Sequence, residues 1–295
     1  MRVFVTGASG WVGSAVVAEL IGAGHSVVGL ARSDANAEKL AAAGAEVHRG
    51  SLEDPDSLKR GAAAADGVIH CAFIHDFSKM VENSAIDRRA IDAMGETLSG
   101  SGRPLIATSG VGLLRPGEVA TEEMTRGPEP HFPRVSEAAA LAFAPLGVRA
   151  MAIRLAPTVH GNGDHGFVPR LVAIAREKGS AGYVGEGLNR WPAVHRLDAA
   201  RLYRLALEKG AAGAQYHAVA EEGVSFKDIA AVIGKRLGVP VVRVAPGKAA
   251  EQFGWFAMFA GMDMPASSAI TRKGLGWSPT ELGLLADLDQ PYYFG

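Results

Sequence analysis

The first part of the chain alternates short apolar runs with segments whose apolar residues recur at helical spacing. Residues 2–6 form a β-branched and aromatic run that ends in glycine-rich sequence, as a buried strand would. Residues 11–21 then place their apolar side chains at helical spacing, and the glycines of residues 22–24 supply a stop. The pattern therefore predicts a strand, a glycine turn and a helix, in that order.

The same alternation continues along the first half of the sequence. Further strands are predicted at residues 25–31, 46–48, 67–72, 104–108 and 148–155, and further helices at residues 35–43, 55–64 and 136–144. Strands that alternate with helices in this way form right-handed crossovers and a parallel sheet covered on both faces. We therefore predict an α/β fold: a doubly wound parallel sheet of six or seven strands, forming a Rossmann domain over residues 1–160.

The pattern changes after residue 160. Glycine-rich stretches at residues 161–166 and 179–187 flank a predicted helix at 168–177, and helices at 226–237 and 249–259 follow. A chain of 295 residues has room for a second lobe. We expect residues 161–295 to form mainly a smaller, substrate-binding lobe, with the strand-like segments inside residues 191–220 returning to the Rossmann sheet.

Composition narrows the class of partner. Thirty basic and 31 acidic residues leave a formal net charge of −1, so no overall field draws the protein to nucleic acid or anionic lipid. We expect a small-molecule partner and no nucleic-acid or membrane partner, and leave homodimerisation open. The single cysteine, Cys71, lies in an apolar run and cannot form an intramolecular disulfide. With no secretory signal pattern and no apolar run of membrane length, we expect a cytoplasmic protein.

A glycine motif lies between the first predicted strand and the first predicted helix. Its first glycine permits positive φ, its second lets backbone N–H groups approach a pyrophosphate, and its third lets the helix pack closely on the strand. The helix N-terminus then faces the negative charge. The motif predicts a dinucleotide site, with a tight turn that binds nothing as the alternative. The residues concerned are Gly7, Ser9, Gly10, Trp11, Val12 and Gly13.

The end of the second predicted strand indicates which dinucleotide is bound. An NAD-specific domain usually offers an acidic residue to the ribose hydroxyls at this point, and none is present. Arg32 and Ser33 offer a guanidinium and a hydroxyl that suit a 2′-phosphate. In the alternative, Ser33 or Asp34 caps the next helix while Arg32 is solvated, and both interpretations can hold together. We predict that NADP(H) is preferred over NAD(H).

Four further stretches accompany the glycine motif, at residues 50–52, 68–72, 154–161 and 194–200. In this order they resemble features of the extended and atypical short-chain dehydrogenase/reductases, a family that includes nucleotide-sugar epimerases and dihydroflavonol reductases. Residues 50–52 resemble the family's loop beside the adenine, and residues 68–72 resemble its strand under the cofactor. Residues 154–161 resemble its Arg-Pro-x-x-Val-Tyr-Gly stretch, and residues 194–200 resemble its Val-His-Val-x-Asp-Val-Ala stretch. The resemblance implies further cofactor contacts from Ser51, Leu52, Cys71 and Ala72.

The sequence departs from this family at the catalytic pair. Such reductases place Tyr-x-x-x-Lys at the start of the helix after the fifth strand, where the lysine lowers the tyrosine pKa and the tyrosine passes a proton. Here Pro133 and Glu137 align with the pair, and no tyrosine in the sequence is followed four residues later by lysine. The usual chemistry of the family therefore needs a substitute.

Several polar residues follow the predicted strands that line the cleft. Ser109 aligns with the family serine or threonine that hydrogen-bonds a substrate carbonyl, or it caps a strand-end turn. His75 or Asp76 after the fourth strand, or His131 and Arg134 near the vacated tyrosine position, are candidates for the missing proton donor. The histidines are scattered without ligand spacing, so we expect no metal site.

An aromatic and methionine-rich cluster lies in the second half: Phe253, Trp255, Phe256, Met258, Phe259, Met262 and Met264. It suits an apolar ligand, or it packs against the first lobe or a second subunit. We expect an NADPH-dependent reductase of a small, largely apolar carbonyl or conjugated compound, with Ser109 orienting the substrate. The alternatives are a non-catalytic NADP-binding sensor or regulator and a sugar-nucleotide epimerase or dehydratase.

Overall fold

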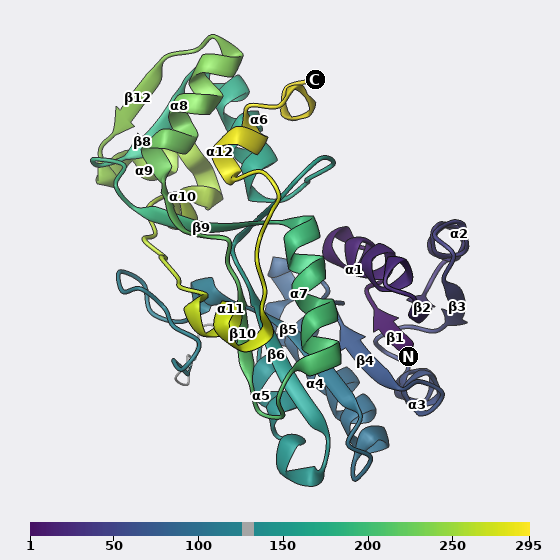
Figure 1. Ribbon diagram of the computed structural model, residues 1–295. Helices are drawn as coiled ribbons and strands as arrows, with labels where there is room; N and C mark the ends of the chain where they lie inside the picture. Colours follow the sequence, from purple (N-terminus) through teal and green to yellow (C-terminus); the bar gives the residue numbers. More distant parts are fainter. Residues whose placement is uncertain (126–132) are drawn as a thin grey trace.

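A computed structural model describes residues 1–125 and 133–295 and shows a parallel sheet flanked by helices, with a smaller lobe at one end (Figure 1). Within the described residues the main sheet has seven strands in the order β10-β6-β5-β4-β1-β2-β3, and every neighbouring pair is parallel. This confirms the doubly wound Rossmann sheet. The strands are β1 (Arg2–Thr6), β2 (Ser26–Ala31), β3 (Glu46–Arg49), β4 (Gly67–His70), β5 (Pro104–Gly110), β6 (Arg149–Leu155) and β10 (Gln215–Ala218).

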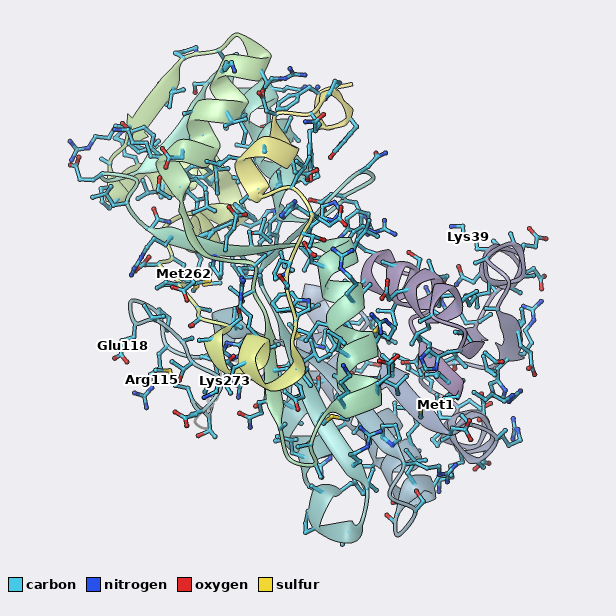
Figure 2. All side chains as sticks on the ribbon, in the orientation of Figure 1. Met1, Lys39, Arg115, Glu118, Met262 and Lys273 are labelled. Atoms are coloured by element: carbon cyan, nitrogen blue, oxygen red, sulfur yellow. The ribbon has the colours of Figure 1, made fainter. Side chains whose placement is uncertain are left out.

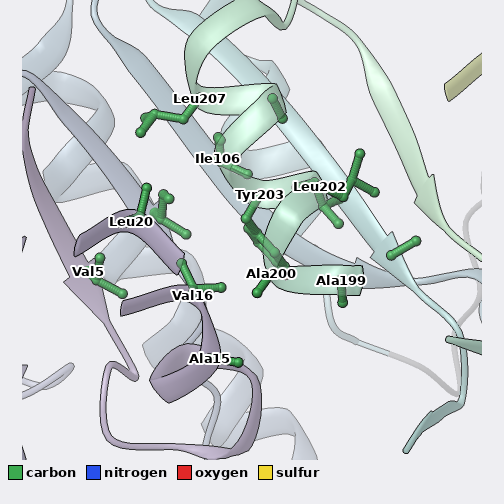
Figure 3. Close-up of a cluster of buried hydrophobic side chains, with 14 of the residues drawn as sticks. Val5, Ala15, Val16, Leu20, Ile106, Ala199, Ala200, Leu202, Tyr203 and Leu207 are labelled. Atoms are coloured by element: carbon green, nitrogen blue, oxygen red, sulfur yellow. The ribbon is translucent and has the colours of Figure 1, made fainter. Parts of the chain in front are cut away.

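Helices cover both faces of this sheet because strand side chains alternate between them. One face packs against α1 (Trp11–Gly22), α2 (Asp34–Ala42) and α7 (Arg196–Lys209), and the other against α3 (Pro55–Ala63), α4 (Met80–Leu98) and α5 (Ser136–Leu141). Figure 3 shows Val16 of α1 facing Ala200 and Tyr203 of α7. The sequence pattern did not predict α4, whose buried face includes the polar residues Asn83 and Asp87.

The smaller lobe has a core of its own around Trp191, Phe226 and Phe256. Its strands are β7 (Thr158–His160), β8 (Ala181–Val184), β9 (Arg190–His195), β11 (Glu221–Ser225) and β12 (Val241–Val244). Its helices are α6 (Phe167–Lys178), α8 (Phe226–Leu237), α9 (Ala249–Phe253), α10 (Ala257–Ala260) and α12 (Leu284–Leu288), while α11 (Ala269–Leu275) packs beside β10.

Residues 191–220 divide between the two parts, which corrects the expectation that both strand-like segments in this range return to the main sheet. β10 is the edge strand of that sheet, whereas β9 pairs with β7 and β11 in a separate sheet. The residues between them form α7, which the pattern did not predict. Its first residues, Arg196 and Leu197, extend an apolar run that resembles a strand.

The aromatic and methionine-rich cluster is mainly core. Phe253, Phe256 and Met264 are buried with the other aromatic residues of the smaller lobe, which favours the packing interpretation. Trp255 and Met258 are each 59% exposed. The single helix expected at residues 249–259 is interrupted, because Gly254 adopts a positive φ of 57° between α9 and α10.

Charged side chains cover the outer surface of both lobes (Figure 2). Arg115 and Glu118, which are labelled there, project from the loop after β5 and pair at 3.6 Å. In the parts of the chain that the structure describes, no helix combines the length and the apolar character needed to cross a membrane.

Candidate active site

The loop between β1 and α1 requires glycine at two positions. Gly7 has φ 68°, and a Cβ atom there would lie 2.7 Å from the backbone nitrogen of Ala72. A Cβ atom at Gly13 would lie 2.1 Å from the carbonyl oxygen of Gly7. The conformational roles predicted for these glycines, a positive φ and a close approach of helix to strand, are therefore confirmed.

The N-terminus of α1 has the character of an anion site. No side chain caps it, and its first turn contains no acidic residue. The first amides of a helix have no partner within the helix and lie at its positive end. The amides of Trp11 and Val12, with Ser9 and Gly10 in the preceding turn, fit the pyrophosphate of a dinucleotide.

The end of β2 carries the residues predicted to select the 2′-phosphate. Arg32 is exposed, and among the described residues it forms no ion pair and no side-chain hydrogen bond. Ser33 caps α2 by accepting a hydrogen bond from the Asn36 amide at 3.3 Å, so the capping interpretation is confirmed. Asp34 pairs with Arg49 at 2.6 Å. The phosphate role of Arg32 and Ser33 stays a prediction.

Ser51 and Leu52 follow β3 on the same side of the sheet. Both are half-buried; the Ser51 hydroxyl accepts from the Glu53 amide at 3.3 Å, and Leu52 packs against the core beneath α3 and α4. Their contact with the adenine stays a prediction.

The Trp11 side chain turns away from the loop and toward the smaller lobe. Its indole N–H donates to the carbonyl oxygen of Val159 at 2.9 Å, and the Arg196 guanidinium lies 4.2 Å above its ring. The His165 ring meets its edge at 5.6 Å. Any cofactor contact of Trp11 would therefore come from its backbone amide, while its side chain links the two lobes.

Cys71 and Ala72 lie directly after β4, since the strand ends at His70 rather than at residue 72. The Cys71 amide donates to the Thr6 carbonyl at 3.1 Å. Burial raises the pKa of the Cys71 thiol to about 12, although hydrogen bonds with Thr108 and Tyr203 oppose the shift. The thiol therefore stays protonated and is not a nucleophile.

Tyr203 does not replace the family tyrosine. The Thr108 hydroxyl donates to the His70 carbonyl at 2.8 Å, so the Tyr203 hydroxyl, 2.7 Å from Thr108 Oγ1, donates to it. The side chain is fully buried on the α7 face of the sheet, and burial raises the pKa of Tyr203 well above its ordinary value. It is a structural hydroxyl beneath the site.

On the opposite face, a chain of hydrogen bonds runs from the core to Arg134. The His70 ring lies 2.7 Å from Thr6 Oγ1 and 3.0 Å from Asp87 Oδ1. The Ser136 hydroxyl donates to Asp87 Oδ2 at 2.5 Å and accepts from Arg134 Nε at 2.8 Å. Burial tends to raise the pKa of Asp87, but the bond and charge of His70, the charge of Arg134 and the Ser136 bond hold it below its ordinary value.

Arg134 itself lies at the carboxyl ends of β4 and β5. Its Nη2 donates to the Thr108 carbonyl at 2.9 Å, and its guanidinium lies 4.0 Å from the centre of the Phe73 ring. Ligands of open α/β sheets bind outside the carboxyl ends of the strands. The structure therefore places this predicted residue beside the expected reaction site.

His75 is close to this charge. Its ring meets Phe73 edge-on at 5.3 Å, and desolvation together with the positive charge of Arg134 lowers the His75 pKa. A histidine with a lowered pKa is mostly neutral at pH 7, so it is a poor source of a proton. His75 is better suited to accept a hydrogen bond than to act as a general acid.

Ser109 is the last residue but one of β5 and directly follows Thr108, whose carbonyl holds Arg134. Its side chain is half-buried and, among the described residues, has no hydrogen-bond partner. The turn-capping alternative is therefore not observed. Ser109 keeps a hydroxyl available at the same edge of the sheet as Arg134.

Three other predicted positions have different outcomes. Asp76 accepts hydrogen bonds from the Ser78 amide and hydroxyl in the loop after β4, which is a local turn role. Glu137 holds the buried Arg154 guanidinium at 2.6 Å, so it does not occupy a lysine position in the cleft. His131 lies outside the described residues.

The glycine-rich loop at residues 161–166 adds groups that the sequence did not single out. His165 contacts Trp11, and its charge contributes to the lowered pKa of His75. Burial raises the pKa of Asp164 to about 6, although its hydrogen bond from the Gly166 amide opposes the shift. In the described part of the chain no group of histidine, cysteine or acidic residues is placed to hold a metal ion.

His70 and Asp87 are the main positions that sequence reasoning missed. His70 was visible as a histidine inside an apolar strand, which is unusual enough to suggest a buried polar partner. Asp87 had no such signal, because it lies on a helix that the pattern did not predict and meets His70 only through the fold.

Comparison with known proteins identifies the family. The model of the NAD dependent epimerase/dehydratase family matches residues 3–96. An uncharacterized protein of Schizosaccharomyces pombe is 52% identical over 295 residues, which is all of both chains. An uncharacterized protein of Saccharomyces cerevisiae is 49% identical over 295 residues, 99% of each chain. The chain belongs to the NAD-dependent epimerase/dehydratase family, as an atypical short-chain dehydrogenase/reductase.

More distant matches agree with this class. A decarboxylating sterol-4-alpha-carboxylate 3-dehydrogenase of Dictyostelium discoideum is 28% identical over 257 residues, covering 81% of this chain and 77% of that protein. The dTDP-glucose 4,6-dehydratase of Streptomyces venezuelae, solved with NAD bound, shares the fold with a TM-score of 0.77 at 19% identity, covering 98% of this chain and 95% of that one. The family is NAD(P)-dependent and contains reductases, dehydrogenases and epimerases.

Proposed function

We propose that this protein is an NADP(H)-dependent oxidoreductase that reduces small, largely apolar carbonyl or conjugated compounds. One observation carries the proposal: the Arg134 guanidinium and the Ser109 hydroxyl lie at the carboxyl ends of β4 and β5, along the sheet edge that also holds the glycine loop. A dinucleotide site and a polarising pair on one edge are the parts that a reductase needs.

Different residues of the chain would bind different parts of the cofactor. The amides of Trp11 and Val12 would hold the pyrophosphate, and Arg32 and Ser33 the 2′-phosphate. The residues after β3 and β4, at positions 51–52 and 71–72, would border the adenine and nicotinamide ends. When bound, the reduced cofactor supplies a hydride.

Ser109 and Arg134 would act on the substrate oxygen. The Ser109 hydroxyl donates a hydrogen bond to the carbonyl oxygen and orients it. Arg134 supplies a fixed positive charge that stabilises negative charge as it develops there. The named dehydrogenase relative supports oxidoreductase chemistry. The aromatic and methionine-rich stretch of residues 253–264 contains no lysine or arginine, which favours an apolar substrate over a nucleotide sugar.

The first experiment measures binding and consumption of NADPH by the purified protein, with NADH in parallel. The panel contains ketones, aldehydes, quinones and enones, and the loss of reduced-nicotinamide absorbance is followed. Substrate-dependent loss that prefers NADPH is the expected result. Tight NADPH binding with no loss on any compound would contradict turnover and would favour the alternative of a sensor or regulator.

Ser109→Ala tests the substrate contact. Removing one hydrogen bond to a developing oxyanion is expected to lower kcat/KM by about tenfold or more. The dissociation constant of NADPH should stay unchanged, because Ser109 is not among the residues assigned to the cofactor. An unchanged rate would remove Ser109 from the mechanism.

A further inference from the structure

Arg134 is held more firmly than a surface arginine. Its guanidinium bonds to Ser136 Oγ and the Thr108 carbonyl, and its flat face lies on Phe73. Ser136 is in turn fixed by Asp87, and Asp87 by His70, all three with side chains buried. A guanidinium has five N–H donors, so these bonds set its plane while it keeps its full charge.

Asp87 supplies the negative charge in the chain of hydrogen bonds that leads to Arg134. Its lowered pKa keeps it ionised at neutral pH, and both carboxylate oxygens are used, one by His70 and one by Ser136. The Ser136 hydroxyl bridges Arg134 Nε and Asp87 Oδ2, so the carboxylate orients the arginine through this hydrogen bond. His70, Asp87 and Ser136 are therefore positioning residues.

A fixed guanidinium favours one kind of product. Reduction of an isolated ketone forms an alkoxide, which is more basic than arginine and needs a proton as it forms. Arginine is a poor general acid for that step, because giving up its proton would leave a neutral guanidine, a strong base, and would remove the positive charge of the site. An enolate or a hydroquinone anion spreads its charge and can exist as an ion beside a cation.

Resting on the proposed function, we propose that His70, Asp87 and Ser136 position Arg134 as an oxyanion holder, and that the site takes α,β-unsaturated carbonyl compounds, enones and quinones, rather than isolated ketones. A hydride from the reduced nicotinamide adds to the β-carbon of an enone, and the nicotinamide is oxidised. The carbon–carbon π pair moves into the enolate, and the carbonyl pair moves onto the oxygen that Arg134 stabilises. Water then protonates the α-carbon.

A binding experiment without turnover tests the oxyanion holder. The probe is 4-nitrophenol, whose anion resembles an enolate and absorbs visibly, added to the protein with NADP⁺ over a pH series. We expect the ionisation midpoint of bound 4-nitrophenol to fall by about one pH unit or more. Arg134→Met should abolish this shift, Arg134→Lys should keep part of it, and Asp87→Asn should reduce it.

Matched controls separate positioning from general damage. Asp92→Asn and Arg88→Met alter an exposed ion pair on the same helix and should leave the shift intact. The neutral analogue 4-nitroanisole should bind wild type and Arg134→Met alike. The proposal is overturned if 4-nitrophenol fails to bind, binds without a shift, or shifts equally in Arg134→Met and Arg134→Lys.

A substrate pair tests the class directly. Cyclohex-2-enone should consume NADPH at least about tenfold faster than cyclohexanone, and deuterium from C4-labelled NADPH should appear on the β-carbon of the product. Equal rates, with the label on the carbonyl carbon, would refute this inference while leaving the proposed function standing. If no compound of the panel caused NADPH consumption, the proposed function would be refuted. The 4-nitrophenol experiment would still test whether Arg134 stabilises an oxyanion.

Discussion

At the end of β2, Ser33 combines an observed local role with a proposed role in cofactor binding. The Ser33 hydroxyl caps α2, yet its neighbour Arg32 stays exposed at the C-terminal edge of the strand. A capping serine still presents lone pairs to solvent, and an exposed arginine loses little by binding a phosphate. The local role of Ser33 therefore does not compete with the cofactor role proposed for the pair.

Arg32→Ala tests this assignment at the residue scale. Only NADPH carries the 2′-phosphate, so its affinity should fall by about tenfold or more, while the affinity for NADH should barely change. Titration of both cofactors into the variant provides the comparison. Arg60→Ala, on the exposed side of α3, is the matched control. Equal weakening of the two cofactors would contradict the phosphate assignment.

At the scale of elements, the glycine loop joins β1, α1 and the end of β4 into one unit. Gly7 lies against the backbone of Ala72, and Gly13 against the carbonyl of Gly7. These contacts are between backbones, so a neighbour cannot move aside as a flexible side chain could. The position of the α1 amides, and with it the predicted pyrophosphate site, depends on them.

Gly13→Ala is expected to displace this loop. The new Cβ atom would lie 2.1 Å from the Gly7 oxygen, so dinucleotide binding should fall by at least about tenfold and the melting temperature should drop. Gly22→Ala, at the far end of the same helix, is the control. Nothing lies within 4 Å of its added Cβ atom, and alanine favours the helix, so stability should hold or rise by up to about 1 kcal/mol. Equal NADPH binding by the two variants would argue against a tight loop.

For the whole molecule, His217 joins the main sheet to the C-terminal segment. Its Nε2 accepts from Arg154 of β6 at 3.2 Å, and its Nδ1 donates to the Ser267 carbonyl at 2.8 Å. Its own amide donates to the Thr271 hydroxyl on α11. Both ring nitrogens are satisfied only in the neutral imidazole, because a proton on Nε2 would face the N–H of Arg154.

This arrangement predicts a loss of stability in mild acid. Burial, assisted by the Arg154 charge, lowers the pKa of His217 to about 4, whereas an unfolded histidine titrates near 6.5. The unfolded chain therefore binds the extra proton first, and unfolding free energy should fall by about 3 kcal/mol between pH 6.5 and pH 4. Urea unfolding across this range measures it. His217→Gln should be less stable at pH 7 but show a flatter pH dependence, and an unchanged slope would exclude His217 as the cause.

The sequence by itself determined the Rossmann sheet, the glycine loop and the family. Apolar strands that alternate with helices admit few arrangements, and the need for glycine at residues 7 and 13 is local backbone geometry. It also marked Arg134, Ser109 and His75 as candidates, because residues after parallel strands share one edge. Their chemical roles and the preference for NADP(H) remain predictions.

Only the tertiary structure decided which of these residues are held by hydrogen bonds, and which distant residues provide those bonds. The contact between His70 and Asp87 joins a strand to a helix 17 positions later, and Ser136 meets Asp87 across 49 positions. The same holds for β9, which was expected as a strand of the main sheet but whose partners are β7 and β11. Periodicity reports which face of an element is buried, and it carries no information about which distant element does the burying.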